Sequence, residues 1–319
     1  MTALAKQEYT YTISKGDTLW GLANEYTRIN KGVSHAEAQK RILNLNPSLT
    51  AANMKAGQVI VLPFAKASSM AAKTPRTGYE KWQDTVKQGI SDVKWDEHDS
   101  IIRSAVAEFN TRLGKKSVYV EKPMPALNWL WIKAIIWVES GGPTNASWGS
   151  RPMQIGNPGD PAHGVLKAQA EGSGIIMDKT LTSNINAINT PKINIQAGTA
   201  YLLTRLSKSM MKSVLSQTDK KEKSYTVVAG DSLDKISRKC NTTVDVLKQY
   251  NPKHVKLIRP GDKLKYYTAK IERVIVGWHS VSAKVIAKQY NSELVDKSYT
   301  TKLTYVMDEI FPNLIRNSK

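Results

Sequence analysis

The segment 127–155 constrains the fold of this chain more than any other, because its first half has no polar face. Within residues 129–138 every side chain is apolar except that of Lys133. A helix that is apolar on all sides has to be surrounded by protein or by lipid. Because this run is too short to cross a bilayer, we expect a helix buried in the core of a helical domain. The glycine pair at 141–142 is expected to end it.

The buried helix carries a carboxylate, Glu139, in its last turn. Burial favours the neutral form of a carboxyl group, and the negative end of the helix dipole acts in the same direction. We therefore expect a raised pKa and a group that can donate a proton near neutral pH. A glutamate whose head reaches water or pairs with a basic residue is the alternative interpretation.

The residues that follow resemble those of a catalytic family. Glu139-Ser140 is followed by Ser150 and then by Met153-Gln154-Ile155, an order that resembles the soluble lytic transglycosylase and goose-type lysozyme superfamily. Arg151-Pro152 stands where members usually carry Gly-Leu. The predicted helix at 194–210 resembles the Asn-Ile-x-Ala-Gly-x-x-Tyr-Leu helix of the same enzymes. The resemblance implies a lysozyme-like catalytic domain with Glu139 as the general acid and base.

The same resemblance assigns residues around the bound sugar. It implies that Ser150, Met153 and Gln154 hold the substrate, and that an aromatic residue on a later helix faces the glutamate. Trp278, within the segment 275–285, is our preferred candidate for that aromatic residue, and Tyr290-Asn291 is the alternative register. Thr304-Tyr305-Val306 resembles the closing Tyr-Val helix, in which Tyr305 would hydrogen-bond or position Glu139.

Whether the enzyme hydrolyses its substrate depends on a second carboxylate. A retaining hydrolase needs a partner roughly 5 Å away and an inverting one needs it at roughly 6.5–9.5 Å. Asp160, Glu171 and Asp178 are candidates, although a turn or cap is the preferred role for Asp160. The resembled transglycosylases use no partner, because the C6 hydroxyl of the substrate closes a 1,6-anhydro ring. Both mechanisms stay open, and we favour the transglycosylase.

An internal repeat marks two small units. Residues 11–23 read YTISKGDTLWGLA and residues 225–237 read YTVVAGDSLDKIS. Each copy continues with an Asn-Pro and then a glycine before a closing strand, which predicts a βααβ unit used twice. Gly16 and Gly57 lie about ten residues farther apart than their counterparts, and we place the extra residues at 30–36.

Both copies resemble LysM modules, which bind the N-acetylglucosamine backbone of peptidoglycan or chitin. A βααβ unit that only packs and binds no ligand is the alternative. The resemblance implies glycan contacts at matching positions of the two copies: Gly16, Asp17, Thr18, Asn46, Pro47 and Gly57 in the first, and Gly230, Asp231, Ser232, Asn251, Pro252 and Gly261 in the second.

These features predict an α+β protein with a mainly α-helical lysozyme-like catalytic domain and two small βααβ LysM modules. The second module would be an insertion into the catalytic domain. The predicted organisation is a LysM module at 9–63, a linker and bracing helix at 64–95, the first part of the catalytic domain at 96–223, the inserted LysM module at 224–268, and the second part of the catalytic domain at 269–319.

Charge and composition limit the partners. The net charge of +19 attracts polyanions such as nucleic acid, anionic membranes or the bacterial envelope. No zinc-finger, helix-turn-helix or RNP motif occurs, so charge alone would support a nucleic-acid partner. The single cysteine, Cys240, excludes an internal disulfide framework, and the five histidines lack zinc-ligand spacing. We expect peptidoglycan glycan strands as the partner, with no metal, no cofactor and no membrane span.

The N-terminal residues lack the apolar run of a secretory signal peptide. We therefore expect a protein that is made in the cytoplasm and reaches the cell wall through a phage holin or a secretion system such as type VI. An effector delivered by such a system would need an immunity protein as its partner. A non-catalytic wall-binding or structural protein is the rival prediction.

Overall fold

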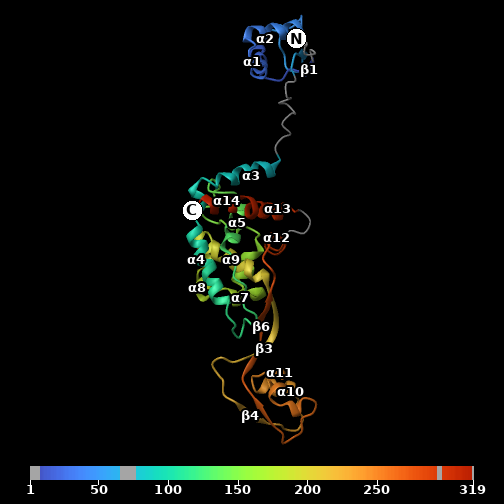
Figure 1. Ribbon diagram of the computed structural model, residues 1–319. Coiled ribbons are helices and arrows are strands. Elements are labelled where there is room, and N and C mark those ends of the chain that lie inside the picture. The colour runs from blue at the N-terminus through green and yellow to red at the C-terminus, as the bar shows by residue number, and fades with distance from the viewer. Residues whose placement is uncertain (1–7, 65–76, 293–296, 318–319) are drawn as a thin grey trace. The chain divides into compact units, whose positions relative to one another are not determined.

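The computed structural model describes residues 8–64, 77–292 and 297–317. The chain forms two compact units, Met1–Tyr79 and Glu80–Lys319 (Figure 1). Among the described residues the β structure consists of three two-stranded antiparallel sheets, β1–β2, β3–β6 and β4–β5. The fold is therefore mixed, with helices forming most of it. Residues 65–76 of the predicted linker and the first seven residues of the chain lie outside the described residues.

The first unit is the predicted βααβ unit, and hereafter it is called the first βααβ unit. Its elements are β1 (Tyr9–Thr12), α1 (Leu19–Ile29), α2 (His35–Asn44) and β2 (Val59–Leu62). The side chains of Thr18 and Ser34 accept hydrogen bonds from the first turns of α1 and α2, which fixes where both helices begin. Its core is a separate apolar cluster formed mainly by Leu22, Ala23, Ile42, Ile60 and Leu62.

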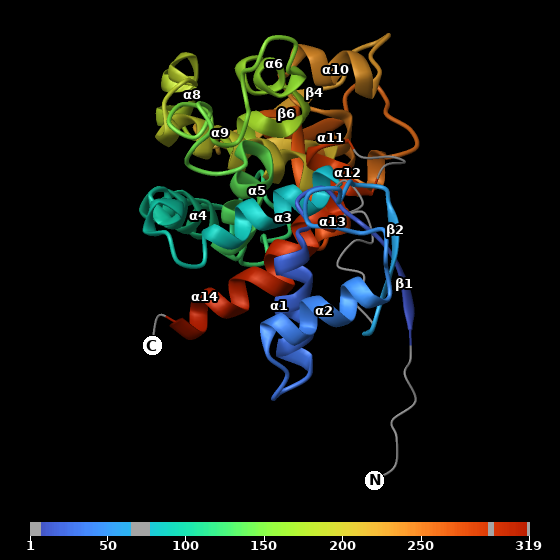
Figure 2. The ribbon, with the colours of Figure 1, turned by 90° about the horizontal axis from the view of Figure 1, so that it is seen from above.

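The second unit contains a helical core built around α5 (Trp129–Ser140). Within this helix Ile132, Ile135 and Trp137 are fully buried, as the sequence predicts. α4 and α13 pack on α5 (Figures 1 and 2). The helices around it are α3 (Gly78–Gln88), α4 (Asp99–Leu113), α6 (Pro161–Lys167), α7 (Ser173–Ile176), α8 (Lys179–Asn184), α9 (Pro191–Leu206), α12 (Ala283–Tyr290), α13 (Ser298–Tyr305) and α14 (Phe311–Asn317), with short turns η1 (Val93–Asp96), η2 (Ala170–Gly172), η3 (Ile185–Ala187) and η5 (Val306–Ile310).

A charged cluster lies against the buried helix. Lys133 is only 3% exposed, and its ammonium group donates hydrogen bonds to the carboxylates of Asp96 and Asp99. The same nitrogen lies 5.5 Å and 5.4 Å from the ring centroids of Trp129 and Trp137. A buried ammonium group needs such partners because leaving it unpaired would cost several kcal/mol. The one charge of the apolar run therefore lies inside the domain.

The second βααβ unit lies in the chain between two strands that pair with each other. β3 (Ser207–Leu215) and β6 (Ala269–Trp278) form an antiparallel ribbon. The unit between them contains β4 (Lys223–Thr226), α10 (Leu233–Lys239), α11 (Val244–Tyr250), η4 (Pro252–His254) and β5 (Lys263–Tyr266).

The ribbon corrects three expectations. The helix predicted at 194–210 ends at Leu206, because the chain enters β3 at Ser207. The run of basic residues from Lys208 to Lys223 suggests, from the sequence alone, a solvated tether, but Lys208 and Lys212 lie in β3. The segment 275–278, predicted to lie on a helix, belongs to β6, and its backbone pairs with β3. Strand pairing between residues that are far apart in the sequence has overridden the local pattern in each case.

Candidate active site

Glu139 lines a pocket of about 220 Å³ in the helical core. The pocket walls come from the end of α5, the loop that follows it, the start of α6, α9, and the end of α12 with the residues after it. The lining residues are Glu139, Met153, Gln154, Ile155, Asp160, Pro161, Ala162, Tyr201, Tyr290, Asn291 and Ser292.

The helix end that carries Glu139 is fixed by glycine. Gly141 has a φ of 70°, and its N–H donates to the carbonyl oxygen of Trp137 at 3.2 Å. Gly142 has a φ of 109°, and a Cβ there would lie 2.4 Å from the Trp95 ring. Both positions therefore require glycine. Ser140, the second residue of the Glu-Ser pair, is buried and its Oγ donates to the carbonyl oxygen of Ile136 at 2.7 Å, so it stabilises the helix end.

The environment of Glu139 favours its protonated form. Burial is the largest effect and raises the pKa of the carboxyl group to about 7. The Oη of Tyr299 donates a hydrogen bond to Oε1 at 2.7 Å, which lowers the pKa and limits the rise. The negative charge of Asp160 raises it further, whereas the ammonium group of Lys302 lowers it. A carboxyl group with this pKa can donate a proton and accept one near neutral pH.

A buried asparagine holds the Met-Gln-Ile segment in the pocket wall. The side chain of Asn194, on α9, accepts from the Met153 N–H at 2.9 Å and donates to the carbonyl oxygen of Ile155 at 2.9 Å. Met153 packs against Gly198, where a Cβ would lie 2.5 Å from its sulfur. α9 is therefore in direct contact with the Met-Gln-Ile segment.

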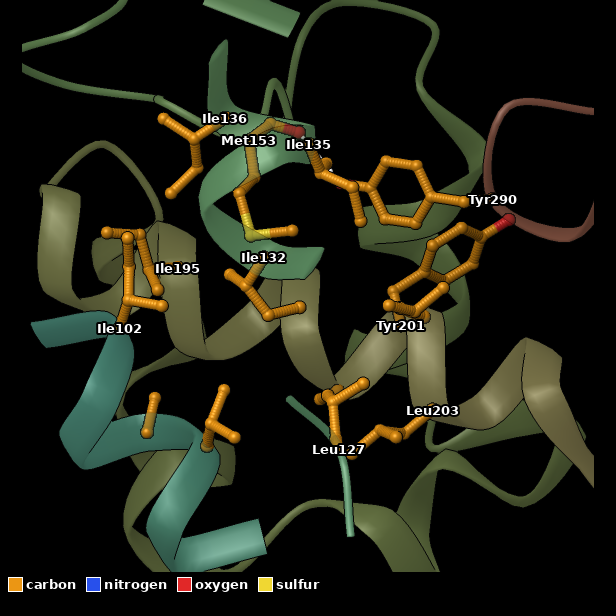
Figure 3. Packing of buried hydrophobic residues seen from close by; sticks show 14 of the residues in the cluster. Ile102, Leu127, Ile132, Ile135, Ile136, Met153, Ile195, Tyr201, Leu203 and Tyr290 are labelled. Carbon is orange, nitrogen blue, oxygen red and sulfur yellow. Dashed lines mark hydrogen bonds between the residues drawn. The ribbon is translucent and has the colours of Figure 1, made fainter. Parts of the chain in front are cut away.

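Tyr290 lines the pocket in direct contact with this segment. Its Oη donates to the carbonyl oxygen of Met153 at 2.9 Å. The ring centroids of Tyr290 and Tyr201 are 5.7 Å apart. Figure 3 shows the two side chains next to each other. The alternative register, Tyr290-Asn291, therefore contributes residues to the pocket.

Trp278, the preferred aromatic residue in the sequence analysis, lies elsewhere. It is the last residue of β6, pairs with Ser207, and its Nε1 donates to the carbonyl oxygen of Lys122 at 2.9 Å. It does not line the Glu139 pocket. The physical reason is that its segment is a strand, which directs the indole towards the 117–122 loop instead of the glutamate.

The hydrogen bond that was expected from Tyr305 comes from Tyr299, six residues earlier on α13. The Tyr305 ring contacts that of Trp82, with 6.0 Å between centroids. No local sequence signal distinguishes the two tyrosines, because both lie on the same helix. Tyr299, Tyr201 and Lys302 are the residues around Glu139 that sequence reasoning missed.

Of the other residues predicted to contact the substrate, Gln154 lines the pocket and Ser150 does not. Gln154 lines the pocket in a left-handed backbone conformation, with a φ of 58°, and its side chain bonds to Arg151 and Asn157. Backbone strain of this kind is frequent at functional sites. Ser150 is outside the pocket lining, and its Oγ donates to the carbonyl oxygen of Ala146 at 3.4 Å.

The candidate second carboxylates are in different places. Asp160 lines the pocket, but its two oxygens accept the N–H groups of Gly156 and Ala162, both at 2.8 Å, and it caps α6. Glu171 forms an ion pair with Arg205, and Asp178 caps α8. Of the three, only Asp160 is near Glu139, and its carboxylate is already used as a cap.

The positions predicted to contact glycan form the loops of both βααβ units. Asp17 and Asp231 accept a backbone N–H from three residues earlier and the hydroxyl of a strand tyrosine. The side chains of Asn46 and Asn251 bridge the second helix to the closing strand in the same way. Thr18 and Ser232 cap the first helices. The four glycines, Gly16, Gly57, Gly230 and Gly261, have φ values between 82° and 96° and open space around them, and Pro47 and Pro252 follow the asparagines.

Comparison with known proteins identifies these two units. The LysM domain model matches residues 11–63 and 225–265. The cell division suppressor protein YneA of Geobacillus thermodenitrificans is 38% identical to the chain over 71 residues, which are 21% of this chain and 68% of that protein. No solved structure gives a significant match. The chain therefore belongs to the LysM-domain proteins, and its two LysM domains imply binding to peptidoglycan.

Two features are absent from the part of the chain that the structure describes. None of its helices is long and apolar enough to cross a membrane. Nor does it contain a group of three or more His, Cys, Asp or Glu side chains that could hold a metal ion.

Proposed function

We propose that this protein cleaves the MurNAc-β-1,4-GlcNAc bond of peptidoglycan with Glu139 as general acid and base, while its LysM domains hold it on the wall. The observation that carries the proposal is the carboxyl group of Glu139, whose pKa burial raises to about 7 in a pocket lined by polar and aromatic side chains. A perturbed pKa in a pocket is a recognised mark of a functional site.

The proposed reaction is that of a lytic transglycosylase. Protonated Glu139 gives its proton to the glycosidic oxygen, and the bond from that oxygen to C1 of MurNAc breaks. The resulting carboxylate then takes the proton of the C6 hydroxyl, whose oxygen bonds to C1 and closes the 1,6-anhydro ring. Tyr299 holds Oε1 of the glutamate throughout. Gln154 and Tyr290 are the proposed contacts to the sugar, since both line the pocket.

Hydrolysis of the same bond, as in a goose-type lysozyme, is the second candidate. The observation in its favour is that Asp160 lines the same pocket as Glu139. Both oxygens of Asp160 already accept backbone N–H groups. A carboxylate used in this way is a weak base for activating water, so ring closure by the substrate is the favoured route.

A wall-binding protein without catalysis is the remaining alternative. The relative named as a cell division suppressor matches only 21% of this chain, so that role is not carried over. A buried glutamate with a pKa near neutrality is costly for a fold that does not use it. This cost favours the enzyme. We further propose that the protein reaches the wall by one of two routes. One is a secretion system, in which case an immunity protein would be its partner, and the other is a phage holin.

The release of soluble fragments from purified sacculi tests the proposal across pH. Because Glu139 has to be protonated to act as the acid, kcat/KM should fall as pH rises through about 7. The Tyr299 hydrogen bond favours the ionised carboxylate, so Tyr299→Phe should raise the pKa of Glu139 and shift this alkaline limb to higher pH. Tyr305→Phe, on the same helix, is the matched control and should leave the limb in place. A limb that does not move in Tyr299→Phe would contradict the assignment of Glu139 as the acid.

A further inference from the structure

The first βααβ unit presents a large aromatic side chain to solvent. Trp20 is 62% exposed, although it is one residue beyond the buried Leu19 at the start of α1. It follows the loop 16–18, one of the two loops expected to contact glycan. An indole combines a flat apolar surface with a polar N–H, which makes exposed tryptophans frequent in binding surfaces.

The ring of Trp20 is held in place by a second aromatic residue. The centroid of the His35 ring lies 5.1 Å from that of Trp20, with 40° between the planes. Nε2 of His35 is 3.0 Å from the backbone carbonyl oxygen of Trp20, so this nitrogen is the protonated one and donates the hydrogen bond. The contact joins the start of α1 to the start of α2 and covers part of the indole, while most of it stays open. A restrained side chain loses less entropy on binding than a free one.

The extra residues of the first βααβ unit lengthen the two helices whose first turns form this pair. α1 has 11 residues where α10 has 7, and α2 has 10 where α11 has 7. The extension is therefore mainly helical, which corrects the placement at 30–36. In the second unit the equivalent of Trp20 is Asp234, which forms an ion pair with Arg238, and the equivalent of His35 is Val244. The aromatic pair thus belongs to one of the two LysM domains.

We propose that Trp20 and His35 form a carbohydrate platform that binds the apolar face of an N-acetylhexosamine ring, in addition to the loops of the first LysM domain. The C–H groups on one face of a β-1,4-linked pyranose form an apolar surface that matches an indole in size, and the acetamido group can accept from the indole N–H. The platform adjoins the Gly-Asp-Thr loop, so the same glycan can contact both. The two LysM domains would then differ in their affinity for the same kind of glycan. This inference does not depend on the proposed glycosidase.

Calorimetric titration of the full chain with a soluble β-1,4-linked N-acetylglucosamine oligomer tests the platform. Glu139→Gln is used as the background so that no turnover occurs. We expect two sites of unequal affinity. Trp20→Ala should weaken the tighter site about 10-fold, because a stacked aromatic ring contributes roughly that much beyond its buried area. His35→Ala should weaken it less, and Trp20→Phe should keep most of the affinity.

Asp234→Ala is the matched control, since it removes an exposed side chain at the equivalent position of the second unit. It should change neither site. The side chains of Trp20 and Asp234 are mostly exposed, so the variants at these two positions should melt at the wild-type temperature. If Trp20→Ala binds the oligomer with the same affinities as the Glu139→Gln background, the proposed platform is wrong. An equal loss in Asp234→Ala, or the absence of oligomer binding by the background protein itself, would also overturn it.

Discussion

Replacing Glu139 with glutamine is expected to lower the release of soluble fragments from sacculi about 10²–10⁴-fold, the usual contribution of a general acid. Glutamine has almost the same shape and can still accept the hydrogen bond of Tyr299, but it has no acidic proton that could be transferred to the glycosidic oxygen. The measurement is the initial rate of solubilisation at a pH below 7, where the wild-type carboxyl group is protonated.

The fold should survive this substitution. Because burial raises the pKa of Glu139 to about 7, the folded state holds the proton more tightly than the unfolded chain. Stability is therefore lost as pH rises from the unfolded pKa through about 7, and a neutral glutamine avoids that loss. Glu171→Gln is the matched control, because Glu171 lies outside the pocket in an exposed ion pair. It should keep full activity, and equal rates in both variants would remove Glu139 from the mechanism.

Replacing Lys133 with methionine is expected to lower the free energy of unfolding by about 3 kcal/mol at neutral pH, the cost of leaving a buried charge without its partner. Methionine keeps most of the volume of the lysine side chain but has no positive charge. Asp96 and Asp99, whose side chain is 22% exposed, would therefore lose their ion-pair partner. The measurement is urea unfolding of the wild type and the variant.

Two observations separate this charge effect from a packing defect. Burial raises the pKa of Asp99, so the folded state accepts a proton on this group readily. The destabilisation by Lys133→Met should therefore shrink at acid pH, where the stranded carboxylate is neutral. Adding Asp99→Asn to the variant should recover part of the loss at neutral pH. A Lys133→Met protein that is as stable as the wild type at neutral pH would show that the cluster contributes nothing.

The parts of this fold that sequence predicts well are those with a local cause. The apolar run at 129–138 can only be a buried helix, and the glycines at 141–142 end it, so the position of Glu139 follows from the residues themselves. The capping residues Thr18 and Ser232 and the turns of the repeat have equally local causes. The LysM repeat is visible because each unit repeats all of these signals.

The errors arise where contacts distant in sequence decide. The run that ends at Trp278 is apolar enough for a helix or a strand, and only the partner strand β3 settles the choice. Tyr299 and Tyr305 lie on one helix, and which of them reaches Glu139 depends on how α13 packs on α5. The burial of Lys133 could not be predicted either, because its carboxylate partners lie more than thirty residues away in the chain.

In the proposed mechanism Glu139 works without a second catalytic carboxylate, and the mass of the released products tests this most directly. Sacculi digested by the wild-type protein should give muropeptides with 1,6-anhydro-MurNAc ends, which are lighter than hydrolysed ones by one water molecule. Asp160→Asn, which keeps an oxygen for the α6 cap, should give the same products at a rate within about 3-fold of the wild type. Products with reducing ends alone, together with an inactive Asp160→Asn variant, would contradict this mechanism and show hydrolysis by a carboxylate pair.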